Sequence, residues 1–461
     1  MTSNETSKTE TGTALIDRYD MRVPRYTSYP TAPHFSEAVD DAAYRTWLGA
    51  LDADQGLSLY FHIPFCDSMC WFCACYTKIV QRYEPIREYL DVLHREIGLV
   101  ADALPGRLTA RHLHWGGGSP TLLTPEDWLA LIGALRDRFD VADDAEVAVE
   151  LDPRDTTEAY VAALAAAGVN RVSIGVQDFE PDTQAAINRI QPFEVVARVC
   201  GWLRAHGIQR INLDLMYGLP HQTTARVLDM VDKAVSLDPA RLALFGYAHV
   251  PWMKSHQRMI NEADLPDAAA RLDQVSAASR RLQEHGFRAI GLDHFARPDD
   301  TLAQALEHGR LHRNFQGYTA DTAPVMLGFG ASAIGQLPQG YVQNLSPLRD
   351  YRRHVEDGRL PVARGLALTP EDRLRGDIIE RLMCDLEVDL SAVRARHDGA
   401  VAAVDLSRSL DALAPLVADG LVTMDDDRIT IPDAGRPFVR LAAAAFDAYL
   451  AGGQKRHSRA V

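Results

Sequence analysis

The sequence predicts an α/β fold: a partial (β/α) barrel with an N-terminal extension and a smaller, mainly helical C-terminal domain. Two observations predict the barrel. Short apolar runs alternate with helix-patterned stretches, and a polar or glycine-containing segment follows each run. Strands that alternate with helices indicate parallel strands joined by crossover helices. A closed barrel and an open doubly wound sheet are the alternatives.

The expected strands are runs rich in Val, Ile, Leu and aromatic residues. They cover residues 57–63, 112–117, 146–152, 171–177, 210–218, 241–248 and 287–295. The segments that follow them include FCDSMC, GGGSPT, ELDPR, GVQDF and LMYGLP. Gly, Pro and Asp are also common in ordinary turns. Because parallel folds gather active sites at the carboxyl ends of their strands, however, the repeated pattern predicts the rim of a site with Glu150, Gln177, Asp214 and Asp293 on it.

Three regions are expected along the chain. Residues 1–50 form an N-terminal extension, of which the first ~12 are polar and expected to be disordered. Residues 51–360 form the barrel, and residues 361–461 form helices and a hairpin that resemble a winged helix. The segment PRYTSYP at residues 24–30 is expected to cover the substrate, and we expect residues 1–35 to serve catalysis rather than folding.

Composition excludes several classes of protein. The net charge of −15 over 461 residues argues against nucleic acid as a partner, since phosphate binding requires surplus Lys and Arg. The acidic turn DDD near residue 426 argues against DNA contact by the C-terminal domain. No apolar run reaches the ~18 residues of a membrane span, and the first residues do not resemble a secretory signal. We therefore expect a cytoplasmic monomer, in which clustered cysteines indicate metal binding or catalysis before disulfides.

Four of the six cysteines lie close together, at Cys66, Cys70, Cys73 and Cys75. Structural zinc usually takes two separated ligand pairs, and no second pair is present. The spacing C-x3-C-x2-C instead resembles that of the radical S-adenosylmethionine superfamily. The resemblance implies a [4Fe–4S] cluster on Cys66, Cys70 and Cys73, with the fourth iron open to S-adenosylmethionine. Cys75 is expected not to be a ligand, because a fourth thiolate would leave no iron open to S-adenosylmethionine.

A wider set of motifs makes the resemblance closer. They are PRYTSYPTA (24–32), LYFHIPFCDSMCWFCAC (59–75), HWGGGSPT (114–121), VELDPR (149–154), SIGVQDF (173–179), INLDLMYGLP (211–220), YAHVP (247–251), GLDHFARPDD (291–300), HRNFQGYT (312–319) and GASAIG (330–335). Together they are similar to the family of oxygen-independent coproporphyrinogen III oxidases. This resemblance implies oxidative decarboxylation of two propionates of coproporphyrinogen III to vinyl groups in haem biosynthesis, with an external electron donor and acceptor.

The resemblance also implies two bound S-adenosylmethionine molecules. The contacts implied for the molecule on the cluster are Tyr60, Phe72, Gly117, Glu150 and Ile334. Those implied for the second are Gly118, Ser119, Gln177, Arg189, Asp214 and Ala248. Ser119 stands where the family usually has Thr, which keeps the hydroxyl. Without the resemblance, GGGSPT would equally suit a helix-entry turn and Arg189 a surface helix.

Three other functions remain open at this point. A haem-binding chaperone of the wider family would keep the three cysteines, but the C-x-C extension and PRYTSYP oppose it. A second radical enzyme of the group would act on a different substrate, and HRNFQGYT weighs against it. A winged-helix regulator with a metal sensor is opposed by the acidity and the long α/β region.

Overall fold

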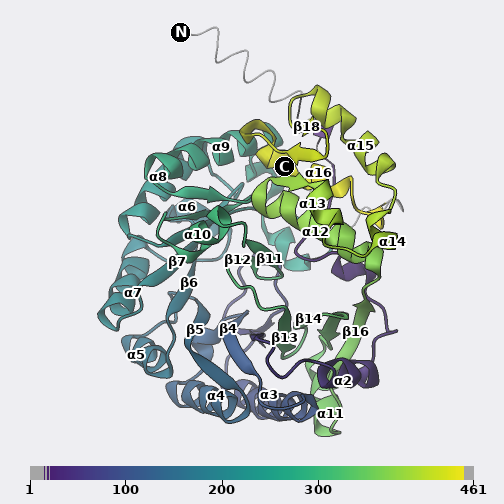
Figure 1. Ribbon diagram of the computed structural model, residues 1–461. Coiled ribbons are helices and arrows are strands. Elements are labelled where there is room, and N and C mark those ends of the chain that lie inside the picture. The colour runs from purple at the N-terminus through teal and green to yellow at the C-terminus, as the bar shows by residue number, and fades with distance from the viewer. Residues whose placement is uncertain (1–14, 16–17, 20, 451–461) are drawn as a thin grey trace.

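One large sheet dominates the computed structural model, which describes residues 15, 18–19 and 21–450. Within this part of the chain its twelve strands run in the order β16-β15-β14-β13-β1-β4-β5-β6-β7-β8-β10-β9. The parallel strands are β1 (Leu57–Ile63), β4 (Thr109–Gly117), β5 (Asp140–Leu151), β6 (Arg171–Gln177), β7 (Arg210–Tyr217), β8 (Arg241–Gly246) and β13 (Val325–Phe329). The sheet curves, with helices around its outer side, as a partial barrel (Figure 1).

Six of the seven predicted strands are confirmed as the parallel strands β1 and β4–β8. The prediction of one strand over residues 287–295 is wrong. This stretch forms β9 (Arg288–Ile290) and β10 (His294–Ala296), which pair antiparallel with each other, and β10 is antiparallel to β8. Gly291 turns the chain between them with a φ of 52°, a conformation that glycine adopts readily. The Tyr318 ring fills the space that a Cβ at Gly291 would need.

The sequence did not predict the strands that extend the sheet beyond β1. β13 pairs parallel with β1 and sets Gly328 opposite Tyr60. The sheet then continues antiparallel through β14 (Ile334–Leu337), β15 (Gly340–Asn344) and β16 (Val362–Ala367). This edge brings Ile334 beside β1, since the backbone carbonyl of Ile334 would be 2.7 Å from a Cβ at Gly328.

The two faces of the sheet differ in polarity. In β1, Leu59, Phe61 and Ile63 belong to the main hydrophobic core. Side chains alternate along a strand, so Tyr60 and His62 lie on the opposite face. The same alternation in the neighbouring strands gives the concave face a set of polar side chains: His114, Glu150, Ser173, Asn212 and Asp214. The inner face of the barrel is therefore suited to polar ligands.

Helices cover the outer face and close the core over the sheet (Figure 1). They are α3 (Glu84–Ala103), α4 (Pro125–Arg138), α5 (Glu158–Ala167), α6 (Pro181–Ala186), α7 (Phe193–Ala205), α8 (Thr224–Ser236) and α9 (Ala268–Glu284), with α2 (Asp41–Gly49), α10 (Thr301–Glu307) and α11 (Leu348–Glu356) at the ends. Several of them begin at a capping side chain; Thr124, for example, accepts a hydrogen bond from the backbone of Asp127 at the start of α4.

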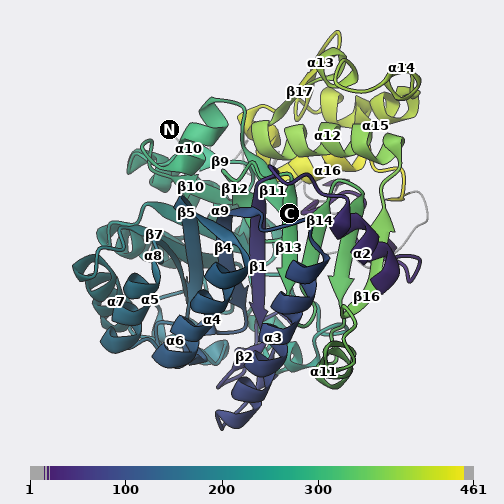
Figure 2. The same cartoon turned by 60° about the horizontal axis from the view of Figure 1, so that its bottom comes forward.

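The C-terminal region packs as a second hydrophobic cluster (Figure 2). Its helices are α12 (Pro370–Asp385), α13 (Leu390–Arg394), α14 (Gly399–Ala402), α15 (Ser407–Ala418) and α16 (Val439–Ala444). The predicted hairpin is present as β18 (Thr423–Asp425) and β19 (Arg428–Thr430), which β17 (Glu387–Asp389) extends to three antiparallel strands. A capping box between Thr369 and Asp372 starts α12.

The N-terminal extension is part of this second cluster. Tyr19, Val23, Tyr26 and Tyr29 are buried among the apolar side chains of α12 and α16. The expectation that residues 1–35 serve catalysis and not folding therefore needs correction, because their removal would open the C-terminal core. The predicted disorder of the first dozen residues lies outside the described residues.

A short hairpin of β11 (His312–Asn314) and β12 (Gly317–Thr319) lies at the centre of the view in Figure 1. Asn314 and Gln316 of this hairpin line a small cavity with Tyr60 and His114 of the sheet. The HRNFQGYT segment thus lies against the polar inner face of the barrel.

Candidate active site

The cysteine loop follows β1 directly. It begins in β2 (Phe65–Cys66), which pairs parallel with β3 (Lys78–Ile79) and so closes the loop at its base. Cys70 is buried, Cys66 and Cys73 are partly buried, and Cys75 is exposed. Cys73 donates its backbone N–H to the carbonyl of Cys70 at 3.2 Å, which folds the loop into a compact turn.

Neighbouring loops hold the cysteine loop through its backbone groups. Asn188 Nδ2 donates to the Met69 carbonyl at 2.8 Å, and the Trp71 N–H donates to the Ile187 carbonyl at 2.9 Å. On the other side, the segment around the short helix η3 (Ser255–Met259) makes three contacts of this kind. Lys254, His256 and Gln257 reach the carbonyls of Cys75, Cys73 and Phe72 at 3.0, 2.7 and 3.0 Å. These contacts fix the backbone of the loop and do not use the cysteine side chains.

Two arginines lie against the sulfur of Cys70. Arg189 Nη1 and Arg154 Nη2 lie 3.5 and 3.6 Å from it. Both guanidinium groups also pair with Asp152 Oδ2, at 2.9 and 2.6 Å. Although burial favours the neutral acid, the charge of Arg189 and the hydrogen bond from Arg154 hold the pKa of Asp152 below its usual range. Both guanidinium groups therefore lie where a cluster bound through Cys70 would bring negative charge.

The other thiols interact with one another. Burial, followed by the charges of Cys73 and Cys70, raises the pKa of Cys66 to about 12. A hydrogen bond with Cys75 is the main cause that lowers the pKa of Cys73 to about 6. The pKa of Cys73 is thus sensitive to its neighbour Cys75. The three cysteines of the motif face one another closely enough to interact electrostatically.

This donor set fits an iron–sulfur cluster. Among the described residues, no group of three or more His, Cys, Asp and Glu side chains is arranged around a single metal ion. A cube of four irons needs a different arrangement, in which separate thiolates reach separate irons. Cys66, Cys70 and Cys73 lie on one loop, with two arginines beside Cys70, and so could each reach a separate iron.

Most of the first predicted contact set comes together above the inner face. Glu150, at the end of β5, accepts hydrogen bonds from Gly117 N at 3.2 Å and lies 3.1 Å from His114 Nε2. Burial alone would raise the pKa of Glu150, but these contacts hold this pKa below its usual range. Tyr60 stacks on His114 with ring centroids 5.9 Å apart. Tyr60, Gly117 and Glu150 thus form one continuous wall of the barrel mouth.

Two members of this set reach the wall from other segments. Phe72 comes from the cysteine loop and packs against the apolar cluster of Ile187, Met216 and Tyr247. Ile334 starts β14, beside the strand that neighbours β1. Glycines make room here: a Cβ at Gly116 would be 2.6 Å from Glu150 Oε1, and Gly117 has a φ of 110°.

The second predicted set divides into three neighbouring groups. Gly118 and Ser119 turn under the cysteine loop, where their N–H groups donate to the carbonyls of Ile63 and Phe65 at 2.8 and 2.7 Å. Gln177 and Arg189 meet at Gly175, whose Cβ would be 3.0 Å from Gln177 Nε2 and 3.1 Å from Arg189 Nη2. Arg189 is buried, so the surface-helix alternative for it is wrong.

Asp214 and Ala248 complete this set. Asp214 accepts hydrogen bonds from Ser173 Oγ and Asn212 Nδ2, each at 2.8 Å. Burial, followed by the charge of Glu150, raises its pKa to about 6. The carbonyl of Ala248 accepts from Gln257 Nε2 at 3.3 Å, and the same amide nitrogen donates to Phe72. Gln257 therefore links the second set to the cysteine loop.

His62 lies beneath the site rather than on the cysteines. Its ring nitrogens contact Tyr60 Oη and the Tyr76 carbonyl, both at 3.0 Å. Burial lowers its pKa. Five residues near the cysteine loop were not assigned from the sequence: Asp152, Arg154, and the three that bind the loop carbonyls, Lys254, His256 and Gln257. The motif VELDPR carries the first two and was a usable signal, whereas residues 254–257 follow no local pattern.

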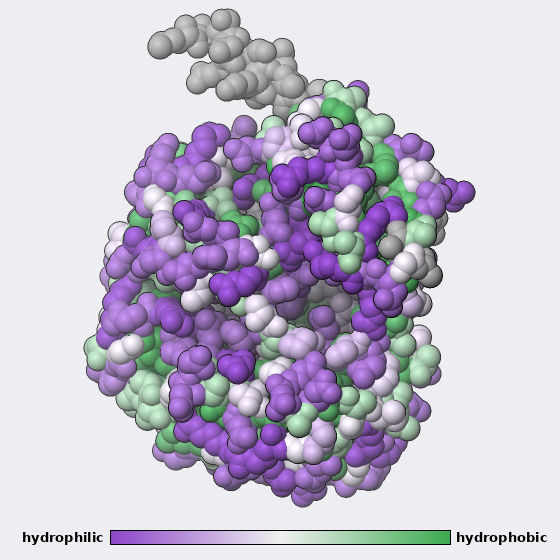
Figure 3. Space-filling view, viewed as in Figure 1, coloured by the Kyte–Doolittle hydropathy of each residue, from purple (hydrophilic) through white to green (hydrophobic). Residues whose placement is uncertain are grey.

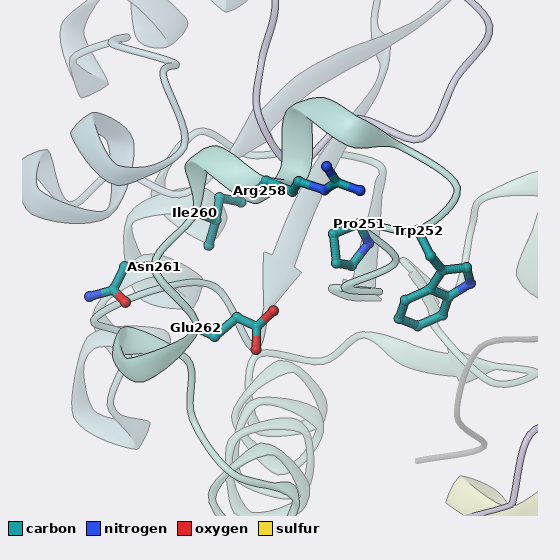
Figure 4. Close-up of a pocket in the computed structure, with 6 residues that line it drawn as sticks. All are labelled: Pro251, Trp252, Arg258, Ile260, Asn261 and Glu262. Carbon is teal, nitrogen blue, oxygen red and sulfur yellow. The ribbon is translucent and has the colours of Figure 1, made fainter.

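A surface pocket opens outside this site. It has a volume of about 560 Å³ and is lined by Pro251, Trp252, Arg258, Ile260, Asn261 and Glu262 (Figure 4). None of the predicted ligand contacts lines this pocket. Separately, no helix in the described part of the chain has the length and apolar character of a membrane span.

Comparison with known proteins agrees with this geometry. A profile described as "Radical SAM superfamily" matches residues 60–234, and one described as "HemN C-terminal domain" matches residues 368–438. An oxygen-independent coproporphyrinogen III oxidase of Bradyrhizobium diazoefficiens is 52% identical over 95% of this chain and 97% of its own length. The protein of that name from Salmonella typhimurium is 40% identical over 95% of each chain.

A solved structure gives the same result for the fold. The coproporphyrinogen III oxidase (HemN) of Escherichia coli, a radical S-adenosylmethionine enzyme, matches with a TM-score of 0.89 at 39% identity, covering 95% of this chain and 99% of that one. Identity at this level over nearly the full length includes both the barrel and the C-terminal region. The chain belongs to the family of oxygen-independent coproporphyrinogen III oxidases.

Proposed function

We propose that the protein converts two propionate side chains of coproporphyrinogen III to vinyl groups and so yields protoporphyrinogen IX for haem biosynthesis. The observation that carries this proposal is the C-x3-C-x2-C loop, with Arg189 Nη1 3.5 Å from the sulfur of Cys70, in a chain 52% identical to such an oxidase over 95% of its length. Each propionate loses one hydrogen atom from its β-carbon, one electron and CO2. An external acceptor takes up the electron, and an external donor supplies the reducing electron for each turnover.

The family uses a [4Fe–4S] cluster and S-adenosylmethionine. We assign the cluster to Cys66, Cys70 and Cys73. When bound, these cofactors supply a 5′-deoxyadenosyl radical, which can remove a hydrogen atom that no side-chain base is strong enough to take as a proton. The chain supplies orientation and exclusion of water. Arg154 and Arg189 balance negative charge at Cys70, and both are held in place by Asp152.

The first S-adenosylmethionine molecule is assigned to Tyr60, Phe72, Gly117, Glu150 and Ile334. Glu150 is an ionised acceptor at the mouth of the barrel, because hydrogen bonds from Gly117 and His114 lower its pKa. It can accept hydrogen bonds from an amino group or a ribose hydroxyl. Gly117 lets the ligand approach the backbone closely, while Phe72 and Ile334 offer apolar surface.

A second S-adenosylmethionine molecule is assigned to Gly118, Ser119, Gln177, Arg189, Asp214 and Ala248. Two features of these residues support the assignment. The Nε of Arg189 is buried and has no hydrogen-bond partner within the described residues, which leaves it available to a ligand. Gln177 has a φ of 69°, and strained backbone of this kind at a non-glycine residue occurs preferentially at functional sites.

We propose further that the enzyme acts as a cytoplasmic monomer without a nucleic-acid partner. A reducing compartment protects cluster-binding thiols from forming disulfides. The net charge of −15 disfavours contact with phosphate backbones. Size-exclusion chromatography with light scattering, carried out on the holoenzyme without oxygen, tests the oligomeric state.

The reaction is tested by anaerobic incubation of reconstituted protein with coproporphyrinogen III, S-adenosylmethionine and a one-electron reductant. We expect protoporphyrinogen IX, methionine and 5′-deoxyadenosine, resolved by chromatography. The Cys70→Ser variant serves as the matched control and should form none of them. If wild-type protein with a full complement of iron forms no protoporphyrinogen, the proposed function is wrong.

A further inference from the structure

Two segments that lie far apart in the sequence bring one arginine each to the same place. Arg25 belongs to PRYTSYP, and its Nη2 reaches the carbonyl of Gly246, at the end of β8, at 3.5 Å. Arg313 belongs to HRNFQGYT, and its guanidinium lies 4.3 Å above the Tyr318 ring. Both arginines act electrostatically on the same carboxyl, Asp293, and on the same cation, Arg440.

Arg313 is not satisfied by the residues around it. Its Nε and Nη1 are buried and have no hydrogen-bond partner within the described chain. Asp293 is the carboxylate that acts on it, but Asp293 Oδ1 is already 2.7 Å from His294 Nδ1. A buried cation with two nitrogens that lack hydrogen-bond partners costs free energy, because its lost hydration is only partly replaced. A role in binding a ligand would explain why the Arg313 guanidinium is buried with two of its nitrogens lacking partners.

Arg25 is also held loosely by the protein. It is exposed, its contact with the Gly246 carbonyl is long, and it forms no ion pair with a described residue. A flexible guanidinium at the edge of the site can move to meet a ligand. Its planar fork of donors suits a carboxylate, which it can bind through two parallel hydrogen bonds.

The surroundings are strongly cationic. Arg440 is buried, and its Nε donates to the carbonyl of Pro24, the residue before Arg25, at 3.0 Å. Burial, followed by the charges of Arg25 and Arg313, lowers the pKa of Arg440 to about 9. Burial alone would raise the pKa of Asp293, but the contact with His294 and the charges of these two arginines lower this pKa to about 2. In a chain of net charge −15, this is a local site for an anion.

The location connects this site to the reaction centre. The hairpin that carries Arg313 also carries Asn314 and Gln316, which line a cavity with Tyr60 and His114. The hairpin lies at the centre of Figure 1, and the same view as a surface has a hollow with hydrophilic residues there, between the barrel and the C-terminal helices (Figure 3). The hairpin thus joins Arg313 to the segment that lines the cavity over the inner face.

We propose that Arg25 and Arg313 together bind one propionate carboxylate of the tetrapyrrole substrate and thereby fix its orientation over the inner face of the barrel. This inference rests on the proposed function, since it concerns the substrate of that reaction. No bond changes at this site: the carboxylate accepts hydrogen bonds from two guanidinium groups, and the reacting propionate lies elsewhere on the ring.

The test is a set of neutral variants in reconstituted holoenzyme: Arg25→Gln, Arg313→Gln and the double variant. Loss of one charged hydrogen-bonding partner should raise KM for coproporphyrinogen III about ten- to hundredfold, with kcat changed far less. Because both arginines are proposed to hold the same carboxylate, the double variant should lose less than the product of the two single losses. Arg313→Lys should recover part of the loss, because the charge remains. Arg310→Gln, exposed just before the same hairpin, is the matched control and should leave KM unchanged.

Two further readouts separate this inference from the proposed function. Iron content and 5′-deoxyadenosine release without substrate report whether each variant is folded and loaded. Titration with coproporphyrin III, the stable oxidised analogue, measures binding without turnover, and the two single variants should bind it about tenfold more weakly or worse.

If wild type turns over coproporphyrinogen III and both single variants keep its KM, the inference is wrong and the proposed function is supported. If wild type has no turnover but the arginine variants bind coproporphyrin III more weakly, the proposed function is wrong and the carboxylate site is supported. If wild type does not bind coproporphyrin III, both are wrong.

Discussion

Arg189 Nη1 lies 2.9 Å from Asp152 Oδ2 and 3.5 Å from the sulfur of Cys70, so one buried guanidinium joins a carboxylate of the barrel rim to the cysteine loop. Arg154 repeats the arrangement from the same motif as Asp152. The pair of cations is balanced by one carboxylate in the protein, and thiolates at the loop would supply the remaining negative charge. This arrangement links cluster assembly to the stability of the loop.

Asp152→Asn is expected to destabilise the protein and reduce cluster loading. Removing one partner of a buried charge pair costs about 3 kcal/mol, because the remaining charges are left uncompensated. The melting temperature of the apo protein and the iron content after reconstitution should both fall. Asp102→Asn removes the carboxylate of an exposed pair with Arg138 and should change neither. A variant at Asp152 with wild-type iron content and melting temperature would contradict this prediction.

Single Cys→Ser variants should separate ligands from a neighbour. We expect Cys66→Ser, Cys70→Ser and Cys73→Ser to lose the visible absorbance of the cluster and most of its iron after anaerobic reconstitution. Cys75→Ser should retain both, because a fourth thiolate would occupy the iron that S-adenosylmethionine needs. Because Cys75 influences the pKa of Cys73, this variant is a demanding test of the assignment. Loss of the cluster in Cys75→Ser, with retention in one of the other three, would reverse the assignment.

The fold was predictable where its signal is local. Strands β1 and β4 to β8 carry continuous apolar runs that end in glycine or polar residues, and the sequence pattern placed them within a few residues. The 287–295 run failed because Gly291 reverses the chain, and that turn depends on Tyr318, which comes from a distant hairpin. β13 was missed because its five residues are too short to carry a pattern, and its pairing with β1 spans more than half the chain.

The site was predictable to a similar extent. The cysteine spacing and the glycines before Ser119 point to a ligand site because their residue types limit what they can do. The contacts of Arg189 and Gln257 cannot be read from spacing, because each side chain binds a backbone carbonyl or a thiol that belongs to another segment of the chain. The unsatisfied nitrogens of Arg313 are likewise a property of the folded chain, since its neighbours in the sequence do not determine which carboxylates surround it.

Asp214→Ala should reduce the number of bound S-adenosylmethionine molecules from two to one. The side chain accepts from Ser173 and Asn212 on the inner face, and its removal takes away the carboxylate while leaving the cysteine loop untouched. Equilibrium dialysis of labelled S-adenosylmethionine against iron-loaded protein measures the stoichiometry. Asp229→Ala, on the exposed side of α8, is the matched control. If the variant binds two S-adenosylmethionine molecules, this assignment is wrong. If it binds none, Asp214 is needed for the molecule on the cluster as well.

Glu96 is expected to make stability depend on pH. It lies buried in α3 and accepts hydrogen bonds from Gly330 N, Asn344 Nδ2 and Tyr351 Oη at 2.7, 2.6 and 2.6 Å. It thus fastens the β13–β15 edge, which carries Ile334, to the barrel. Burial raises its pKa from 4.5 to about 7, although the three hydrogen bonds oppose this shift.

The sign follows from proton binding. Between the unfolded pKa of 4.5 and the folded pKa of about 7, the folded state binds more protons at Glu96 than the unfolded chain. Stability from this group is therefore fully present below pH 4.5 and is lost as the pH rises to about 7, with a total of about 3 kcal/mol.

Glu96→Gln cannot titrate, so its melting temperature should fall less than that of wild type between pH 5 and pH 8. The absolute stability of the variant can differ for other reasons, and the slope is the readout. Glu88→Gln, exposed on the same helix, should follow the wild-type curve. Parallel curves for wild type and Glu96→Gln across this range would show that the buried carboxyl does not titrate there.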